Sequence, residues 1–391
     1  MASFISEDNI EQALLQRLQH IHGFNVLDCY TAKPEDLNDG SHRADKRDVI
    51  FPAELKTACL ELNPAIPESK IDEAVEHVME RRAAMSPIAA NRELYDLIRD
   101  GVSVQFDDDR GIKQHEKIRL VHFDDPKQNR WLAVSQLWIK SVAQAPKAAY
   151  RRPDVILYVN GLPLVFIELK NSNVRLRNAF EDNLRSYRHD IPQLFHCNAF
   201  CVLSNALETR VGSFTAGWEH FFNWFRVESE KEAINRKEIT EQAASLEHAA
   251  DGLCEKARLL DYVENFILFH KGETKIIAQN HQFLGVNNAY ERFLNRREHE
   301  GKLGVFWHTQ GSGKSFSMIF YARKIFRKAT GNFSFVVVTD RQDLDGQIYR
   351  NFLNTETVRK EDAAQPANAE EMRKFLGQNK KVVFTLIQKF R

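Results

Sequence analysis

Two acidic residues and a lysine near the middle of the chain have the types and spacing of a metal-dependent phosphodiesterase. Asp154 is followed by Glu168 and Lys170, with Asn160-Gly161 between them. An Asn-Gly pair between two apolar runs is a strong signal for a β-hairpin. Pairing through that turn brings the end of the second strand beside Asp154, and residues two apart on a strand share a face. We therefore expect two carboxylates and one ammonium group to converge at one end of a hairpin.

Such a cluster is costly among apolar strands, because a buried charge costs several kcal/mol unless it is paired or bound to metal. Mg²⁺ would offset this cost through Asp154 and Glu168, since it binds through one or two carboxylates and completes its shell with water and phosphate oxygens. The ion would lower the pKa of a bound water, and Lys170 would orient that nucleophile or stabilise the transition state. The alternative is a strand-end salt bridge between Lys170 and either acid.

The segment 177–190 is predicted to be an amphipathic helix, with Phe180, Leu184 and Tyr187 on one face. Asn183 and Tyr187 lie one turn apart, so both can point at the same neighbour. An amide and a phenol facing the carboxylates would suit holding a phosphate or a metal-bound water, and we include both among the candidate catalytic residues. The alternative is a core tyrosine beside a solvent-exposed Asn183.

A second candidate site is the glycine-rich sequence TQGSGKS at 309–315. The apolar run 303–307 before it and the helical pattern after it give the strand–loop–helix context of a phosphate-binding loop. Glycines let backbone N–H groups wrap phosphates, and the helix N-terminus favours negative charge. Lys314 would contact the β and γ phosphates of ATP, and Ser315 would bind Mg²⁺. The predicted ATP-binding residues of this loop are Thr309, Gly311, Ser312, Gly313, Lys314 and Ser315.

Gln282 is a further candidate for ATP binding. It follows His281, in the place where many DNA translocases carry a glutamine that reads the adenine edge. His308 departs from the general phosphate-loop motif, which has Gly or Ala at its position.

The elements that position these residues form two patterns. Helical periodicity is expected from Ser6 to Ile21 and over 68–100, followed by short strand-like runs between 102 and 170, which favour a mixed sheet with flanking helices. Residues 226–257 are charged and rich in Ala, Glu and Lys, which predicts a helical connection. FSFVVVTD and KKVVFTLI, after the glycine-rich loop, are predicted strands of a parallel sheet.

Composition excludes several classes of protein. The 391 residues are 43% hydrophobic and 28% charged, with 54 basic and 54 acidic residues. These values exclude a fibrous or disordered chain, and the apolar runs are too short to span a membrane. The five cysteines are scattered, which indicates reduced thiols and a cytoplasmic protein. Cys197 and Cys201 lack a second Cys or His pair, so we expect no metal there.

Taken together, the motifs resemble the restriction (motor and nuclease) subunit of type I restriction–modification enzymes. The resemblance covers nearly the whole chain. It rests on Leu62-Asn63-Pro64, Pro153-Asp154 with Glu168-Leu169-Lys170, Leu259-Leu260-Asp261, Asn265-Phe266-Ile267, His281-Gln282, His308 to Ser315, and Thr339 to Gln347. His308 is common in this family.

The resemblance implies an α/β chain: a PD-(D/E)xK nuclease-like mixed sheet with flanking helices, then an incomplete RecA-like (superfamily 2) parallel lobe. The expected limits are 1–225 for the nuclease, 226–257 for the linker and 258–391 for the first motor lobe. The family's Gln-x-x-x-Tyr motif falls on Asn183 and Tyr187, and Asn is one methylene shorter than Gln. Glu11 on the first helix is within possible reach of the site, but we do not include it.

The resemblance also implies Mg²⁺ and ATP as cofactors, with double-stranded DNA and the methylation and specificity subunits as partners, and no membrane. S-adenosylmethionine would belong to the methylation subunit. No Asp-Glu motif follows Lys314, so we expect a fragment with an incomplete motor. Two alternatives stay open: another nuclease–helicase fusion, from DNA repair or single-chain restriction, and a non-catalytic assembly fragment.

Overall fold

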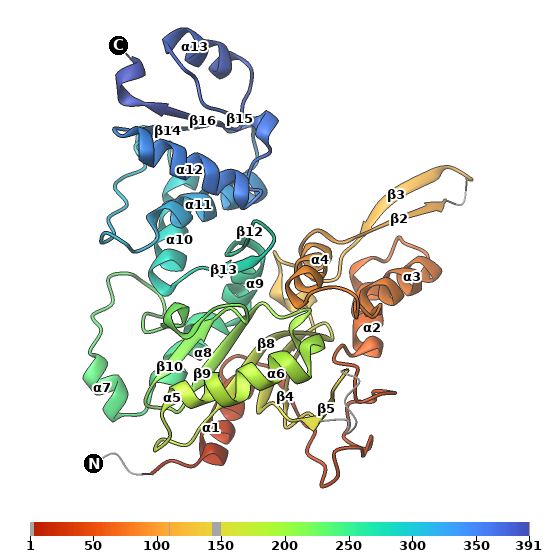
Figure 1. Cartoon of the computed structure of the whole chain (residues 1–391). Helices are drawn as coiled ribbons and strands as arrows, with labels where there is room; N and C mark the ends of the chain where they lie inside the picture. The colour runs from red at the N-terminus through yellow and green to blue at the C-terminus, as the bar shows by residue number, and fades with distance from the viewer. Residues whose placement is uncertain (1–3, 109, 143–149, 391) are drawn as a thin grey trace. The chain divides into compact units, whose positions relative to one another are not determined.

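The chain folds as two units that divide after Glu264. The computed structural model describes residues 4–108, 110–142 and 150–390. The units are coloured from red to green and from green to blue in Figure 1, and each is described by itself.

Unit 1 is built on a seven-stranded mixed sheet in the order β1-β4-β7-β8-β9-β10-β11. β1 is parallel to β4 and β8 is parallel to β9, whereas the other neighbours are antiparallel. The predicted mixed sheet is thus confirmed. Its strands are β1 (Asn25–Asp28), β4 (Trp131–Ser135), β7 (Val155–Val159), β8 (Leu162–Leu169), β9 (Phe200–Ser204), β10 (Thr209–Gly212) and β11 (Phe222–Asn223).

The hairpin of β7 and β8 confirms the turn predicted from its sequence. Asn160 and Gly161 both have positive φ, 52° and 78°, as a tight turn between twisted antiparallel strands requires. All residues of both strands are buried. The carboxylates at the other end of this hairpin are therefore held by the rigid centre of the sheet.

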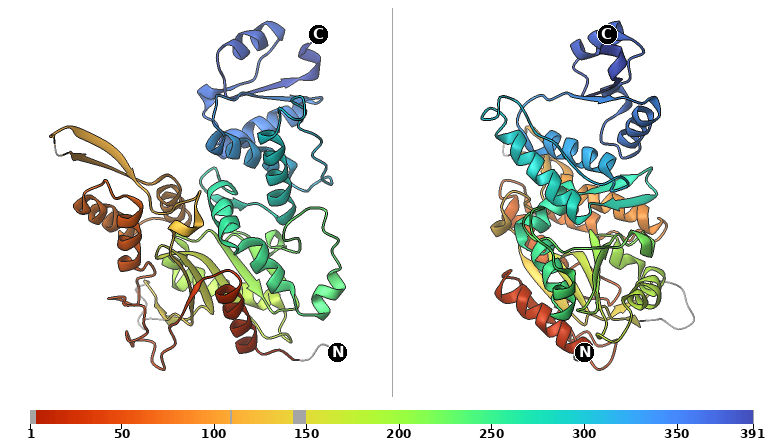
Figure 2. Two further views of the ribbon diagram at one scale, coloured as in Figure 1. Left: turned by 180° about the vertical axis from the view of Figure 1, so that it is seen from behind. Right: turned by 90° about the vertical axis from the view of Figure 1, so that its left-hand side faces the viewer.

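Helices cover both faces of this sheet (Figure 2). α1 (Glu7–His20) begins at Ser6, whose side chain accepts a hydrogen bond from the backbone N–H of Asn9, and its acidic first turn suits the helix dipole. Its apolar stripe contacts β1 and β8. The other helical layer contacts β8 and β9 and is formed by α5 (Leu176–Asn178), the π-helical turn η2 (Ala179–Leu184) and α6 (Arg185–Asp190).

The helix predicted over 68–100 is interrupted. α3 (Glu68–Met79) ends before Glu80, and α4 (Pro87–Asp100) begins after Ser86, whose side chain caps the new helix. The run VSVQF falls in β2 (Val102–Asp107), as expected. The strand expected over IRLVHF, residues 118–123, is wrong: β3 (Lys113–Ile118) precedes that run and shares only Ile118 with it. The β2–β3 hairpin projects away from the sheet (Figure 1).

The segment 226–257 contains helices, and it packs within unit 1. α7 (Arg236–Glu241) is followed by α8 (Ser245–Leu253), which lies against α1. Arg17 on α1 forms ion pairs with Glu247 and Asp251 on α8. The compact unit thus extends past the predicted linker to Glu264. The assignment of a nuclease domain and a motor lobe to their predicted limits stays a prediction.

Unit 2 contains a parallel three-stranded sheet in the order β14-β16-β15, which confirms the two predicted strands. Its elements are β12 (Ile267–His270), β13 (Thr274–Ile277), α10 (Asn280–Leu294), α11 (Lys314–Lys328), β14 (Phe335–Thr339), α12 (Gln342–Asn354), β15 (Ala363–Ala364), α13 (Ala369–Gly377) and β16 (Val382–Leu386).

The prediction of a strand over 303–307 is wrong. These described residues form no strand, and Val305 and Trp307 are 89% and 86% exposed. An extended segment becomes a strand only when another strand takes its backbone hydrogen bonds. The three described strands of this sheet pair with one another and leave the segment outside.

Two exclusions from composition can be compared with the structure. None of the described helices has the length and apolar character needed to cross a membrane. All five cysteines are buried free thiols.

The remaining elements of the described chain are α2 (Pro52–Leu62), α9 (Lys256–Asn265), η1 (Pro126–Gln128), β5 (Ile139–Lys140), β6 (Tyr150–Arg151), η3 (Pro192–Phe195), η4 (Trp218–His220), η5 (Lys360–Asp362) and η6 (Ile387–Phe390).

Candidate functional site

The structure brings Asp154, Glu168 and Lys170 together at one end of the β7–β8 hairpin. Val155 pairs with Ile167, so Asp154 lies beside the end of β8. Asp154 Oδ2 accepts a hydrogen bond of 2.7 Å from the backbone N–H of Leu169. Lys170 Nζ donates to Glu168 Oε1 at 3.0 Å. The strand-end salt bridge is therefore present, but Asp154 next to it makes the cluster an acidic one.

Burial makes both carboxylates hard to ionise. Asp154 is 8% exposed and Glu168 is 1% exposed. Loss of solvation raises the pKa of Asp154 to about 6. The same burial, together with the charge of Asp154, raises the pKa of Glu168 well above its usual range. Burial lowers the pKa of Lys170, but the two acids outweigh that effect and raise it. The cluster thus favours an added positive charge.

One oxygen of Glu168 is left for that charge. Its Oε2 is buried and has no hydrogen-bond partner among the described residues. A buried acceptor without a partner costs about 1–3 kcal/mol, and more when it is charged. Across the described parts of the chain, no group of three or more His, Cys, Asp or Glu side chains is arranged to hold a metal ion. Mg²⁺ needs only one or two carboxylates, so Asp154 and Glu168 fit this ion.

The helical layer supplies the predicted amide. Asn183 Nδ2 donates to Glu168 Oε1, so the alternative of a merely solvent-exposed Asn183 does not hold. Tyr187 is 6% exposed, and its hydroxyl donates to the carbonyl of Arg152 at 3.2 Å. Its ring packs edge-on against Phe166, with centroids 5.7 Å apart. Tyr187 therefore has the surroundings of a core tyrosine, with its hydroxyl at the margin of the site.

Asn183 lies in the π-helical turn η2 rather than in a regular α-helix. A π turn shifts the side chains that follow it around the helix axis, and such turns are frequent at functional sites. The predicted helix over 177–190 is accordingly made of three short pieces. No feature of the sequence indicates this turn.

Two further residues join the cluster. Gln136 follows β4, and its backbone N–H donates to the carbonyl of Asp154 at 3.0 Å. Its side-chain Nε2 donates to Glu11 Oε2 at 2.5 Å. Glu11 on α1 is 6% exposed, and burial raises its pKa to about 7. No pattern in the sequence points to Gln136, whereas the helical position of Glu11 left open whether it reaches the site.

In the glycine-rich loop, Gly311 and Gly313 have positive φ, 79° and 80°. A side chain at Gly313 would also meet Gln282, whose Nε2 lies 2.8 Å from the position of a Cβ. Gln282 Nε2 donates to the carbonyl of Gly313 at 3.0 Å, and its Oε1 accepts from the backbone of Gln279 at 2.9 Å. His281 Nε2 lies 2.9 Å from the carbonyl of Ser312. The start of α10 thus holds the loop, and adenine recognition by Gln282 stays a prediction.

Lys314 and Ser315 begin α11 directly after the loop. Lys314 Nζ donates to the carbonyls of His308 and Thr309, both at 2.8 Å. Ser312 Oγ also donates to the carbonyl of Thr309, at 2.8 Å. The ammonium group therefore rests on backbone carbonyls in the place where a phosphate would offer a stronger, charged acceptor.

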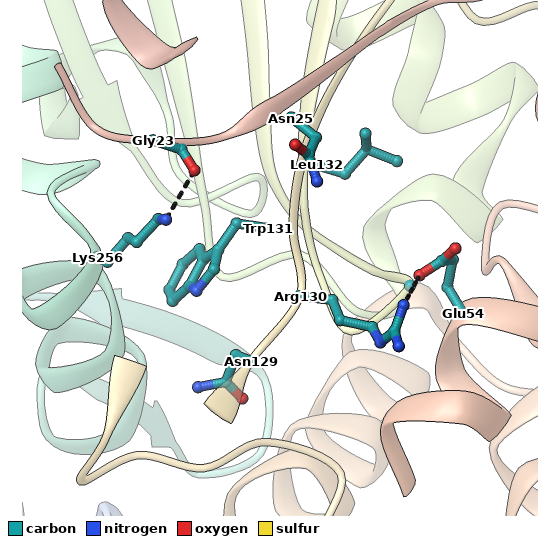
Figure 3. Close-up of a pocket in the computed structure, with 9 residues that line it drawn as sticks. Gly23, Asn25, Glu54, Asn129, Arg130, Trp131, Leu132 and Lys256 are labelled. Atoms are coloured by element: carbon teal, nitrogen blue, oxygen red, sulfur yellow. Dashed lines mark hydrogen bonds and ion pairs between the residues drawn. The ribbon is translucent and has the colours of Figure 1, made fainter. Parts of the chain in front are cut away.

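A cavity of about 370 Å³ lies at the other end of β4 (Figure 3). Lys256 reaches into it and donates to the carbonyl of Gly23 at 2.7 Å. Arg130 forms ion pairs with Glu54 and Glu61. Backbone or acidic partners already bind both cations. This cavity is therefore a weaker candidate for an anion site than the carboxylate cluster is for a cation site.

The fold and the two sites define a class: an α/β chain with a buried acid–lysine cluster in a mixed sheet, followed by a glycine-rich loop of the phosphate-binding type. The chain belongs to the family described as type I restriction enzyme R protein N terminus, whose model matches residues 4–220. A second model, described as SWI2/SNF2 ATPase, matches residues 281–391.

Similar proteins agree with this assignment. The type I restriction enzyme HindI endonuclease subunit of Haemophilus influenzae is 37% identical over 99% of this chain and 36% of its own length. The putative type I restriction enzyme MjaIXP endonuclease subunit of Methanocaldococcus jannaschii is 30% identical over 100% of this chain and 38% of its own. The chain thus spans less than two fifths of the length of these relatives.

Proposed function

We propose that this chain carries the nuclease active site and the ATP-binding loop of the DNA-translocating subunit of a type I restriction enzyme. In this proposal the mixed sheet of unit 1 is a PD-(D/E)xK nuclease, and unit 2 belongs to the first RecA-like lobe of a superfamily 2 motor. The observation that carries the nuclease assignment is the Oε2 of Glu168, beside Asp154 and Lys170, which is buried and has no partner among the described residues.

Asp154 and Glu168 would hold Mg²⁺, which supplies a bound water of lowered pKa and positive charge at the scissile phosphate. The backbone N–H of Leu169 fixes one oxygen of Asp154 and leaves the other for a ligand. Asn183 fixes Glu168 through Oε1 in the same way. Lys170, close to Glu168, would orient the attacking water or stabilise negative charge on the phosphate oxygens.

Unit 2 would bind ATP through the backbone of 309–315 and the start of α11. Lys314 would exchange its carbonyl partners for the β and γ phosphates, and Ser315 would hold the accompanying Mg²⁺. Gln282 would contact the adenine edge once its hydrogen bond to the carbonyl of Gly313 is broken. ATP hydrolysis would move double-stranded DNA before it is cut.

The proposed setting is a cytoplasmic complex. The methylation and specificity subunits are the proposed protein partners, and S-adenosylmethionine would bind the methylation subunit.

The test is Mg²⁺- and ATP-dependent cleavage of circular DNA by the complete enzyme assembled with its partner subunits. Asp154→Ala, Glu168→Ala and Lys170→Ala should each abolish cleavage and leave ATP hydrolysis intact, because the two sites lie in different units. Lys314→Ala is the matched control and should abolish ATP hydrolysis. Cleavage that survives Glu168→Ala would remove the nuclease assignment. Full cleavage without the partner subunits would favour another nuclease–helicase fusion.

A further inference from the structure

An arginine next to the carboxylate cluster lies against two aromatic rings. The guanidinium carbon of Arg152 lies 4.8 Å from the ring centroid of Trp138 and 5.2 Å from that of Tyr30. The Trp138 indole N–H donates to the carbonyl of Thr31 at 3.0 Å, which fixes one ring. We call Tyr30, Arg152 and Trp138 the Arg152 stack.

Strand register places this stack beside the active site. In the pairing of β4 with β7, Ser135 lies opposite Val155. The next pair of strands, β5 and β6, keeps this register, since Ile139 lies opposite Arg151. Arg152 is therefore cross-strand from Trp138 and two residues before Asp154. At about 3.3 Å per residue, the Cα atoms of Arg152 and Asp154 are about 6.6 Å apart when the chain is extended. Tyr30 follows β1, which is parallel to β4, and so reaches the same end of the sheet.

Arg152 differs from its neighbouring arginines in its partners. Within the described parts of the chain its guanidinium group has no hydrogen-bond acceptor and no acidic partner. Its neighbour Arg151 is instead paired with Asp190. Arg210 is also stacked, 4.5 Å from the ring of Trp218, but it is paired with Glu208 at 2.6 Å. Arg152 is thus a stacked cation whose N–H groups bind no acceptor among the described residues and can bind an external one.

Stacking prepares this group to bind an anion. Two rings restrict the guanidinium plane, so less conformational entropy is lost when its N–H groups bind, and a planar fork matches two phosphate oxygens. Tyr30 is 59% exposed, so the stack is accessible from solvent. The guanidinium charge also opposes the rise in the pKa of Asp154 that burial causes.

We propose that the Arg152 stack binds the phosphate next to the scissile phosphate on the cut DNA strand and so sets the position of that strand over Asp154 and Glu168. This proposal rests on the nuclease function proposed above. Its ligand is the phosphodiester backbone, so the stack contributes affinity and position without reading base sequence.

The experiment measures binding of a fluorescently labelled duplex to the 391-residue chain by anisotropy, with Ca²⁺ replacing Mg²⁺ to prevent cleavage. The dissociation constant is determined over a series of salt concentrations. Each phosphate contact contributes about 0.9 to the slope of log K against log salt. Arg152→Ala should lower that slope by about 0.9 and weaken binding about 10- to 100-fold. Arg152→Lys should keep the slope, because the charge remains, and lose affinity, because the planar fork is gone.

Arg210→Ala is the matched control, since it removes a stacked but acid-paired arginine elsewhere in the same unit and should leave slope and affinity unchanged. Thermal melting of each variant reports whether it folds. If Arg152→Ala does not fold, the binding affinity of Arg152→Lys is the test. A wild-type slope and affinity in the Arg152 variants, or an equal loss in Arg210→Ala, would overturn this proposal alone. Failure of the wild-type chain to bind duplex DNA would count against the proposed function as well.

Discussion

Replacing Asp154 with Asn tests whether the unliganded fold is destabilised by a buried negative charge. Burial raises the pKa of Asp154 from its usual 3.8 to about 6. Each pKa unit corresponds to about 1.4 kcal/mol, so at high pH the ionised side chain costs the folded state about 3 kcal/mol. Because the folded pKa is raised, the contribution of Asp154 is favourable below about pH 4 and is lost as the pH rises through about 6.

Asp154→Asn should therefore be about 2–3 kcal/mol more stable than the wild type at pH 8 in EDTA, and close to it near pH 4. The amide can keep the hydrogen bond from the backbone of Leu169 through its oxygen. The assay is urea unfolding followed by tryptophan fluorescence, which reports mainly on unit 1 because four of the five tryptophans, Trp131, Trp138, Trp218 and Trp224, belong to it.

Mg²⁺ should remove most of this difference in stability. At a hundredfold excess over its dissociation constant, a bound ligand stabilises the fold by about 2.7 kcal/mol, and only the wild type should gain this. Asp251→Asn is the control of opposite sign, since Arg17 and His22 outweigh burial and hold the pKa of Asp251 below its usual range. It should destabilise the fold at pH 8. A pH-independent difference between Asp154→Asn and wild type would refute the electrostatic reasoning.

Four further substitutions test other parts of the account. Asn183→Ala should slow single-turnover cleavage about 10- to 150-fold, the effect of one hydrogen bond to a charged group of about 1.5–3 kcal/mol; an unchanged rate would show that Asn183 only packs. Tyr187→Phe should slow cleavage less than Asn183→Ala and lower the free energy of unfolding by about 0.5–1.5 kcal/mol, because its hydroxyl bonds a backbone carbonyl. Glu11→Gln should gain about 3 kcal/mol over wild type between pH 4.5 and 8, since burial raises the pKa of Glu11 to about 7 and its stabilising contribution is lost through that range; equal pH profiles would contradict this. Lys314→Ala should lose ATP binding in calorimetry, and retained affinity would show that the loop holds phosphate without its lysine.

Local signals were enough to predict the centre of the site. The Asn160-Gly161 turn is specified by its own residues, and it fixes the pairing of β7 with β8. The spacing of Glu168 and Lys170 then places both side chains together. These features follow from strand periodicity and turn chemistry, which act over a few residues.

Features that depend on pairing between distant segments could not be predicted. Gln136 meets Glu11 only because β4 pairs with β7 and α1 packs on the same sheet. The stacking of Arg152 against two rings has the same origin. The apolar run 303–307 satisfies a strand pattern, yet in the described structure no strand pairs with it. Sequence pattern reports what a segment favours, whereas the neighbours that complete it are set by the fold.

The most direct test of the central claim is a calorimetric titration of Mn²⁺, as a stand-in for Mg²⁺, into the 391-residue chain without nucleotide. Wild type and Lys314→Ala should bind the ion saturably, because the carboxylate cluster is independent of the glycine-rich loop. Glu168→Gln should lose this binding, since the amide keeps the shape of the side chain but not its charge. Equal Mn²⁺ affinity in wild type and Glu168→Gln would contradict the assignment of a metal-dependent nuclease centre to Asp154, Glu168 and Lys170.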